Sequence, residues 1–508
     1  MEKMIGGNTM ENPEMNIPWQ SPAPQEPPLP AGKKEFLFGI CAAVCGYLLC
    51  NFTFFGGFGL AFAVLVIACL AGTGVYLIRS GCQMNGYSAA LLALCFVIAA
   101  GFGRSDDGLV KFVMTLFLLV AGDLALCHLA GRNRFRAGGF LSLLDAPMSF
   151  LFNGIGPLPQ ALRGIANTLK NGGRAVRRFG AIGVGLMVAV PVLLMLIPLL
   201  MSADAAFNGL VQLLPELDLS QLIITAIFGT GITSLIYTRG VALRHKTTDM
   251  PELAMGKISV SHLTVNTVLV VVDVVYLMYL LSQLAYFVGG FSGILPEDYT
   301  MAQYARQGFF EMAYLCVINL GIIAMAVGLV RKKDGEAPLS TRLLCLFIGM
   351  VTVFLVCAAS AKMFLYIGGY GLTRLRVLTE VVMLFLCAAT MVVCLWLFLP
   401  KLQYMKFVVI LALAMGAAVL WVDVDTVVAG YNVSAYQSGT LDSIDLDYLD
   451  DLGDGAIPAI ARLLEDADPQ VAQRAREIIR TPKIRWQDFR DWNWASWRAE
   501  QIAREEWP

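Results

Sequence analysis

The sequence predicts an all-α protein, a polytopic bundle of about eleven transmembrane helices followed by a small C-terminal helical domain. Hydrophobic residues make up 57% of the 508-residue chain and charged residues only 15%, whereas a typical soluble domain has about 25% charged residues. The apolar residues are gathered in runs close to the ~20 residues with which a helix crosses a bilayer. In lipid only helices and closed barrels satisfy every backbone polar group, so these runs predict spanning helices.

The chain begins with a polar segment that precedes the first apolar run. Residues 1–35 contain seven prolines and no apolar periodicity, which predicts a disordered, cytoplasmic tail. Eleven candidate spans follow, at about 36–54, 58–78, 87–103, 108–130, 179–201, 219–240, 260–288, 303–330, 339–365, 375–399 and 406–428. They form a first transmembrane group in residues 36–130 and a second group in residues 179–428.

The fifth span and the link before it each allow two interpretations. Pro191 and Pro198 interrupt the fifth span, which predicts either a plain kink or a broken helix of the kind found in transporters. The link 131–178 mixes apolar and basic residues. It is interpreted either as interfacial helices on the inner leaflet or as an ordinary basic cytoplasmic loop.

The distribution of Lys and Arg predicts the orientation in a cell membrane. The basic links are 131–178, the link after the sixth span and the link after the eighth span, and alternation places all three on one side. Because cytoplasmic links are enriched in Lys and Arg, we expect that side to be the cytoplasm. The N-terminus would then be cytoplasmic and the C-terminus extracytoplasmic.

Residues 429–508 differ in composition from the preceding spans and predict a small helical, Trp-rich extracytoplasmic domain. "SIDLDYLDDLG" predicts a short helix that ends at Gly453, and Asp468 with Pro469 predicts the start of a further helix. The helix pair is similar to a single HEAT-like unit, which buries its own apolar face poorly. The Trp-rich end either packs on the short helices or forms an aromatic belt at the outer lipid surface.

Charge, cysteine usage and motifs exclude several function classes. The formal net charge of −1 argues against nucleic-acid binding, which needs a basic surface. The cysteines lie in or beside apolar runs without a CxxC pair, so we expect small buried residues and no metal site. The sequence holds no Walker loop, GxSxG or HExxH motif and no nucleophile–base set. We therefore expect no enzyme and no cofactor.

Four polar residues inside the predicted spans are candidate sites: Asp123, Asp273, Asn266 and Asn319. A carboxylate within the bilayer is costly, so such residues face the bundle interior and are paired or protonated. Asp273 is interpreted either as a proton or cation site or as a buried structural group. We expect it to contact Asn319 or Tyr237, whereas the two asparagines are typical of interhelical hydrogen bonds.

A second candidate site lies at the ends of spans eight to eleven that share one membrane face. These ends carry four cations and four acids: Arg306, Glu311, Lys362, Arg374, Arg376, Glu380, Asp423 and Asp425. Arg376 and Glu380 are one helical turn apart and are placed to pair directly. We expect an outer charged cluster in which protein acids neutralise cations that break the positive-inside trend.

The same segments resemble a known family. "YARQGFFEMAYLCVINL", "KMFLYIGGYGLTRLRVLTE", the stretch from Ala429 to Ile460 and "DWNWASWRA" resemble bacterial membrane proteins catalogued as domain of unknown function 4173 and its relative 4153. That family often has Arg where Lys362 stands, so a bidentate contact there is not implied. The resemblance implies a multi-pass protein of the bacterial inner membrane, and it implies no activity.

Two functions from different classes therefore stay open. The first is a non-enzymatic sensor, scaffold or partner subunit of the cell envelope, whose outer face meets an envelope protein or a small ligand. The alternative is a secondary transporter or channel for an ion or small solute. A polar path from Asp273 to both faces would favour transport, whereas polar groups confined to the outer face would favour the first. The lipid bilayer is the expected surrounding in both cases.

Overall fold

The computed structural model is all-α and describes residues 32–132, 219–245, 259–291, 309–332, 336–480 and 489–506, with isolated helical positions between 147 and 203. The membrane-length helices are α1 Lys33–Phe55, α2 Leu60–Arg79, α4 Gly108–Ala130, α9 Leu219–His245, α10 His262–Phe291, α12 Phe309–Leu329, α13 Leu339–Tyr370, α14 Arg374–Phe398 and α15 Tyr404–Val422. Each of these nine helices of the described part is long and apolar enough to cross a membrane.

One further apolar helix is shorter, α3 Gly86–Gly101 with 16 residues. The predicted all-α polytopic bundle is confirmed. The predicted fifth span, with Pro191 and Pro198, and the link 131–178 lie outside the described residues apart from single positions.

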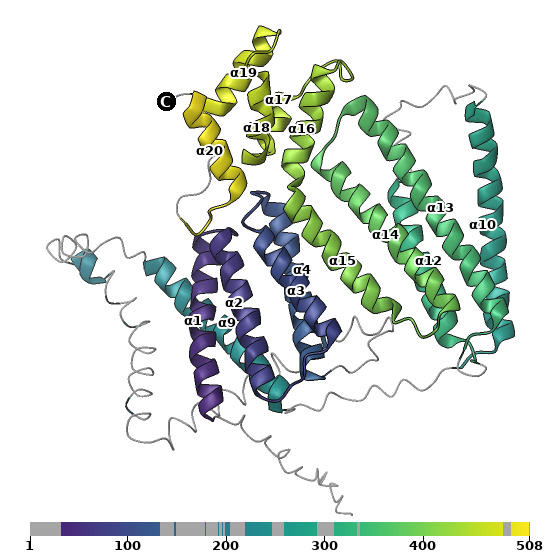
Figure 1. The fold of residues 1–508 in the computed structure, drawn as a ribbon, viewed down its shortest axis with the longest axis horizontal. Coiled ribbons are helices and arrows are strands. Elements are labelled where there is room, and N and C mark those ends of the chain that lie inside the picture. Colours follow the sequence, from purple (N-terminus) through teal and green to yellow (C-terminus); the bar gives the residue numbers. More distant parts are fainter. Residues whose placement is uncertain are drawn as a thin grey trace, which may run out of the picture.

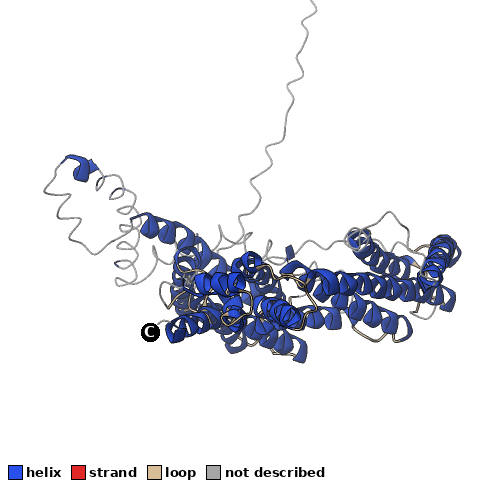
Figure 2. Ribbon diagram, turned by 90° about the horizontal axis from the view of Figure 1, so that it is seen from above, coloured by secondary structure: helices blue, strands red, loops and turns tan. Residues whose placement is uncertain are grey.

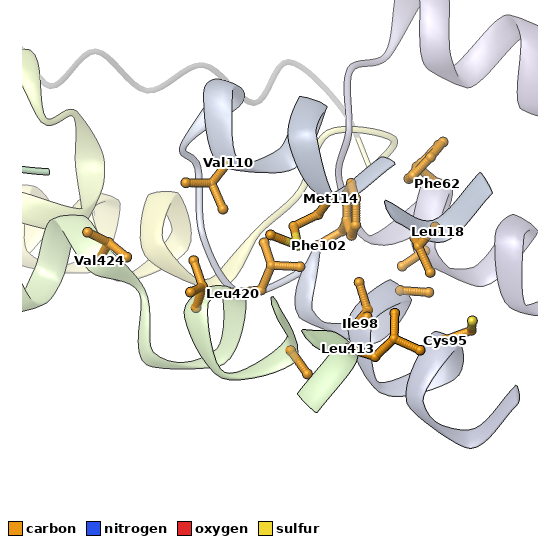
Figure 3. Packing of buried hydrophobic residues seen from close by; sticks show 14 of the residues in the cluster. Phe62, Cys95, Ile98, Phe102, Val110, Met114, Leu118, Leu413, Leu420 and Val424 are labelled. Atoms are coloured by element: carbon orange, nitrogen blue, oxygen red, sulfur yellow. The ribbon is translucent and has the colours of Figure 1, made fainter. Parts of the chain in front are cut away.

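The helices stand side by side, with α1, α2, α3, α4 and α9 in one part and α10, α12, α13 and α14 in the other (Figure 1). Seen from above, the arrangement is elongated (Figure 2). Helix α15 joins the two parts because it packs on both α3 and α14. Around Phe102 the side chains of Phe62, Ile98, Met114 and Leu420 fill the space between α2, α3, α4 and α15 (Figure 3).

Small residues allow the helices to approach closely, as is typical of membrane bundles. An added Cβ at Gly46 of α1 would lie 2.7 Å from the backbone nitrogen of Thr233 in α9. An added Cβ at Gly349 of α13 would collide with the sulfur of Cys394 in α14. These glycines are therefore required by packing and not by a turn.

The helix ends that flank the predicted basic links gather at one end of the bundle, which we name the basic end. There Lys34 Nζ donates to the carbonyl oxygen of Arg79 at 3.1 Å, and Asn85 donates to the carbonyl oxygen of His128 at 3.4 Å. In the other part, Val260 N donates to Leu329 O at 2.8 Å before α10 begins. The last turn of α9 reaches the same end, since His245 contacts the side chain of Glu35.

The C-terminal helices gather at the opposite end (Figure 1). They are α16 Val424–Gln437, α17 Leu446–Asp451, α18 Ile457–Ile460, α19 Pro469–Arg480 and α20 Trp494–Glu506, with 3₁₀ turns at Asp454–Ala456 and Ala461–Leu463. As predicted, α19 begins at Pro469, and the Asp468 carboxylate accepts a hydrogen bond from Gln470 N at 2.8 Å.

The eleventh span ends earlier than predicted. Helix α15 stops at Val422, and Asp423 has φ 58°, a left-handed conformation that no other non-glycine residue of the described part adopts. The chain turns there and continues as α16, so the expected domain boundary at 428/429 falls inside a helix. The physical reason is that α16 packs on the C-terminal helices, with Val428 and Val433 in their apolar core.

Candidate functional site

The C-terminal helices contact three described links that join membrane helices at this end. Leu60 N donates to Trp492 O at 2.9 Å, which holds the α1–α2 link. Trp494 N donates to Gly103 O at 2.8 Å, which holds the α3–α4 link. The amide of Asn432 in α16 makes two hydrogen bonds to the backbone of Leu372 in the α13–α14 link, at 2.7 and 2.8 Å. These contacts attach the C-terminal domain to the membrane helices.

A set of charged side chains lies within this attachment, and we name it the junction cluster. Its members are Asp106, Asp107, Lys111, Arg374, Asp423 and Asp425. Arg374 donates to both carboxylate oxygens of Asp425, from Nε at 2.7 Å and from Nη2 at 2.8 Å. Its Nε also lies 2.9 Å from Oδ2 of Asp107. One guanidinium therefore connects α4, α14 and α16.

Asp107 and Arg374 are held in place by contacts at the ends of their own helices. Asp107 caps α4, because its Oδ1 accepts hydrogen bonds from Leu109 N and Val110 N at 2.9 and 3.2 Å. The other oxygen of Asp107 is then left to face Arg374. The backbone nitrogen of Arg374 donates to the hydroxyl of Tyr448 at 2.9 Å, which fixes the first turn of α14 against the domain.

Four members of the junction cluster, Asp107, Lys111, Asp423 and Asp425, are buried although they are charged, whereas Asp106 and Arg374 are partly exposed. Asp425 has 0% exposed surface and Lys111 5%. Lys111 is attracted by the carboxylates of Asp106, Asp423, Asp107 and Asp491. Such a set is stable only when its charges compensate one another, because each ion loses its hydration.

Burial changes the acid–base behaviour of the two α16 carboxyls. It raises the pKa of Asp425 to about 7, although Arg374 acts in the opposite direction, and the charges of Asp107 and Asp106 raise it further. Burial also raises the pKa of Asp423, whose Oδ2 accepts a hydrogen bond from Thr426 at 2.8 Å. The cluster therefore holds a carboxyl that titrates near neutral pH beside a permanent cation.

Only part of the predicted outer charged cluster comes together in this way. Arg374, Asp423 and Asp425 belong to the junction cluster, whereas Arg306 lies outside the described residues. Within the described part, neither Glu311 in α12 nor Glu380 in α14 forms an ion pair with Arg374.

The predicted pair of Arg376 and Glu380 is wrong. Arg376 donates to the carbonyl oxygens of Tyr370 at 3.1 Å and of Gly371, and its guanidinium lies 4.1 Å from the ring centroid of Tyr366. The reason is that the last carbonyls of α13 have no intrahelical donor. Glu380 instead lies beside Ser360 of α13, and Lys362 lies on α13 about two turns before its end.

Sequence reasoning missed three members of the junction cluster: Asp106, Asp107 and Lys111. A signal was present in "RSDDGLVKF", where an Asp precedes the first helical residue and a Lys follows one turn later inside an apolar span. A lysine in such a place needs acids nearby. The set at the basic end was also missed, where Glu35 contacts Tyr76, Arg244 and His245.

The four predicted intramembrane polar residues have different surroundings. Asp123 forms an ion pair at 2.5 Å with Arg239 of α9, a residue that the sequence assigns to a basic link. The asparagines make interhelical hydrogen bonds, as expected. Asn266 contacts Ser340 and Thr341, and Asn319 contacts Tyr276 and Thr352.

The predicted contact of Asp273 with Asn319 or Tyr237 is wrong. The amide of Asn319 is occupied by Tyr276 and Thr352, and the ring of Tyr237 stacks on Phe38 in the other part of the bundle. One carboxylate oxygen of Asp273 is buried and accepts no hydrogen bond in the described part.

No metal-binding group of three or more His, Cys, Asp or Glu side chains occurs within the described ranges. The family described as "Domain of unknown function (DUF4153)" matches residues 86–463, which is more than half of the chain. The matched stretch includes every member of the junction cluster and Asp273. No curated protein and no solved structure matched the chain.

Proposed function

The chain belongs to the DUF4153 family, and we propose that it is a non-enzymatic component of the bacterial cell envelope, a sensor, scaffold or partner subunit. In this proposal the C-terminal domain lies outside the cytoplasm and meets an envelope protein or a small ligand. The narrower resemblance to domain of unknown function 4173, the HEAT-like character of the helix pair and the bacterial origin belong to the same proposal.

The observation that carries this proposal is the bridge that Arg374 makes between Asp107 and Asp425. A domain that only shields the ends of the membrane helices needs no charged bridge, since apolar packing is less costly to bury. A bidentate guanidinium instead holds α16 in one orientation relative to α4 and α14. A fixed orientation suits a domain that passes a binding event to the membrane helices or presents a surface to a partner.

The orientation is supported by the Lys and Arg residues at the basic end. Lys34, Arg79 and Arg244 lie at the basic end, and the domain lies at the other. A fusion of alkaline phosphatase after Pro508 is expected to be active, and a fluorescent-protein fusion there to be dark. The reverse pair of results would place the domain in the cytoplasm and contradict the proposal.

The partner role is tested by photo-crosslinking in cells. A benzoyl-phenylalanine at Ala467, an exposed position between α18 and α19, is expected to give one discrete protein adduct. The same residue at Val271, which is exposed on the membrane-spanning part of α10, serves as the control and should give lipid adducts alone. Arg374→Ala is expected to reduce the adduct at Ala467, because the domain would no longer be held in one orientation.

The alternative, a transporter or channel, is favoured by one observation, the buried carboxylate oxygen of Asp273 without a hydrogen bond. Against it, the side chains of Met114, Leu118 and Phe102 between the junction cluster and the Asp123–Arg239 pair are apolar and buried. Absence of any protein adduct at Ala467, together with an ion flux in proteoliposomes that Asp273→Asn abolishes, would replace the proposed function by transport.

A further inference from the structure

Helix α10 makes two separate sets of polar contacts that the junction cluster does not include. Near the basic end, Asn266 donates to Ser340 at 2.8 Å and accepts from Thr341 at 2.6 Å. Further along, Tyr276 donates to Asn319 of α12 at 2.5 Å, and Asn319 donates to Thr352 of α13 at 2.9 Å. Both sets are satisfied by groups from neighbouring helices, as structural polar contacts in a membrane bundle are.

Asp273 lies between these two sets on α10. It follows Asn266 by seven residues and precedes Tyr276 by three, so the three side chains share one face of the helix. Unlike its neighbours, Asp273 keeps a buried carboxylate oxygen that accepts no hydrogen bond in the described part. A satisfied structural carboxyl would use this oxygen.

The charges around Asp273 distinguish it from Asp123. Asp123 forms an ion pair at 2.5 Å with Arg239, a permanent cation. The ionisable group that faces Asp273 from α13 is the thiol of Cys345, which is not a cation. Arg342, one turn earlier on α13, pairs with Glu336 at 3.3 Å instead. On α12 the amide of Asn319 is neutral and is occupied by Tyr276 and Thr352.

We propose that Asp273 is a reversible proton-binding site inside the membrane, which exchanges its proton with the basic end, the side on which the polar set of Asn266, Ser340 and Thr341 lies. The carboxylic acid is the resting form, since a carboxylate without a cation is costly in an apolar bundle. On deprotonation the proton leaves toward the basic end, past the buried side chains of Leu269 and Cys345, and the carboxylate carries the charge. Beyond Thr352 the apolar layer of Met312, Val351 and Leu355 closes the route toward the other end.

A proton suits this place better than a metal ion. The groups around Asp273 supply one carboxylate and neutral neighbours, whereas a metal ion needs several oxygen or nitrogen ligands directed at one point. The inference does not rest on the proposed function. A failure of cross-linking at Ala467 would leave the proton site intact, and a failure of the site would leave the domain's role intact.

The test uses a carbodiimide, which reacts with protonated carboxyl groups in apolar surroundings. The full chain in proteoliposomes is treated with dicyclohexylcarbodiimide at pH values from 5 to 9. The modified peptides are quantified by mass spectrometry, and each amount is normalised to the concentration of unreacted carbodiimide at that pH. Modification of Asp273 is expected to be at least tenfold lower at pH 9 than at pH 5. Asp123, which is paired with Arg239, is the control and should be modified less than Asp273 at pH 5.

Three results would overturn the proposal. Modification of Asp273 that is equal at all pH values would mean a permanently protonated structural group, and its absence at all pH values would mean a permanently ionised one. In vesicles with different pH on the two sides, modification should follow the side that holds the basic end, and dependence on the other side would contradict the route. The Asp273→Asn variant should lose the modified peptide, which confirms that the modification is on Asp273. The pH dependence itself is measured on the unaltered protein.

Discussion

Arg374→Ala is the substitution that the structure ties most directly to the position of the C-terminal domain. It removes two hydrogen bonds to Asp425 at 2.7 and 2.8 Å and the ion pair with Asp107 at 2.9 Å. Breaking a buried ion pair from one side costs about 3–5 kcal/mol, because the remaining charge stays buried without compensation. Asp425 limits this loss near neutral pH, since its pKa of about 7 allows it to take up a proton.

We therefore expect the free energy of opening α16 to fall by about 3 kcal/mol at pH 7. The loss should be larger at pH 9, because protonating Asp425 then costs about 1.4 kcal/mol for each pH unit above its pKa. Hydrogen exchange of residues 424–437, in lipid nanodiscs, measures the free energy of opening α16. A loss of 3 kcal/mol corresponds to exchange that is about 100-fold faster.

Arg474→Ala is the matched control for this measurement. Arg474 pairs with Asp447 at 2.8 Å, but both side chains are exposed, so their pair contributes little. If α16 exchanges equally in the Arg374→Ala, Arg474→Ala and unaltered chains, the bridge does not hold the domain and the reasoning is refuted.

Three further outcomes follow from the same contacts. Because the pKa of Asp425 is raised in the folded protein, the folded state keeps a proton that the unfolded state releases between about pH 4 and pH 7. The stability of α16, measured by exchange corrected for intrinsic pH effects, should fall through that window by roughly 2–4 kcal/mol and level off above it. Asp425→Asn should remove the slope, and a retained slope would assign it to another group. Gly371→Ala should destabilise the α13–α14 link by about 1–3 kcal/mol in thermal unfolding, since φ is 74° and the new Cβ would lie 2.8 Å from the amide oxygen of Asn432; unchanged unfolding would show that the link adapts. Asp123→Asn should lower the yield of folded protein, as it leaves Arg239 buried without a counter-charge at a cost of about 3–5 kcal/mol, and Asp123→Asn with Arg239→Gln should recover part of that yield.

The sequence by itself determined the class of this protein and the positions of its helices. A bilayer offers no hydrogen-bond partners, so apolar runs such as Leu60–Arg79 and Arg374–Phe398 have to be helices. Local chemistry also determined helix ends, as where Asp468 caps α19. These features depend on residues a few positions apart, and such interactions are readable without the fold.

The tertiary structure decided which polar and charged side chains contact one another. Arg376 was expected to pair with Glu380, a neighbour on its own helix, and it instead turned to the free carbonyls at the end of α13. Asp123 was recognised as polar, but its partner Arg239 is 116 residues away. The same holds for the bend at Asp423, which only packing of α16 on the domain explains.

The junction cluster shows the physical reason for this division. Helix formation in lipid is forced by the backbone, which is the same at every residue, so composition suffices to predict it. Whether a buried charge is compensated depends on which helix ends meet, and that is set by the packing of all the helices together. Arg374 and Asp425 stand 51 residues apart and Asp107 lies in another part of the chain, and only the docking of the C-terminal domain onto the links brings the three within hydrogen-bonding distance.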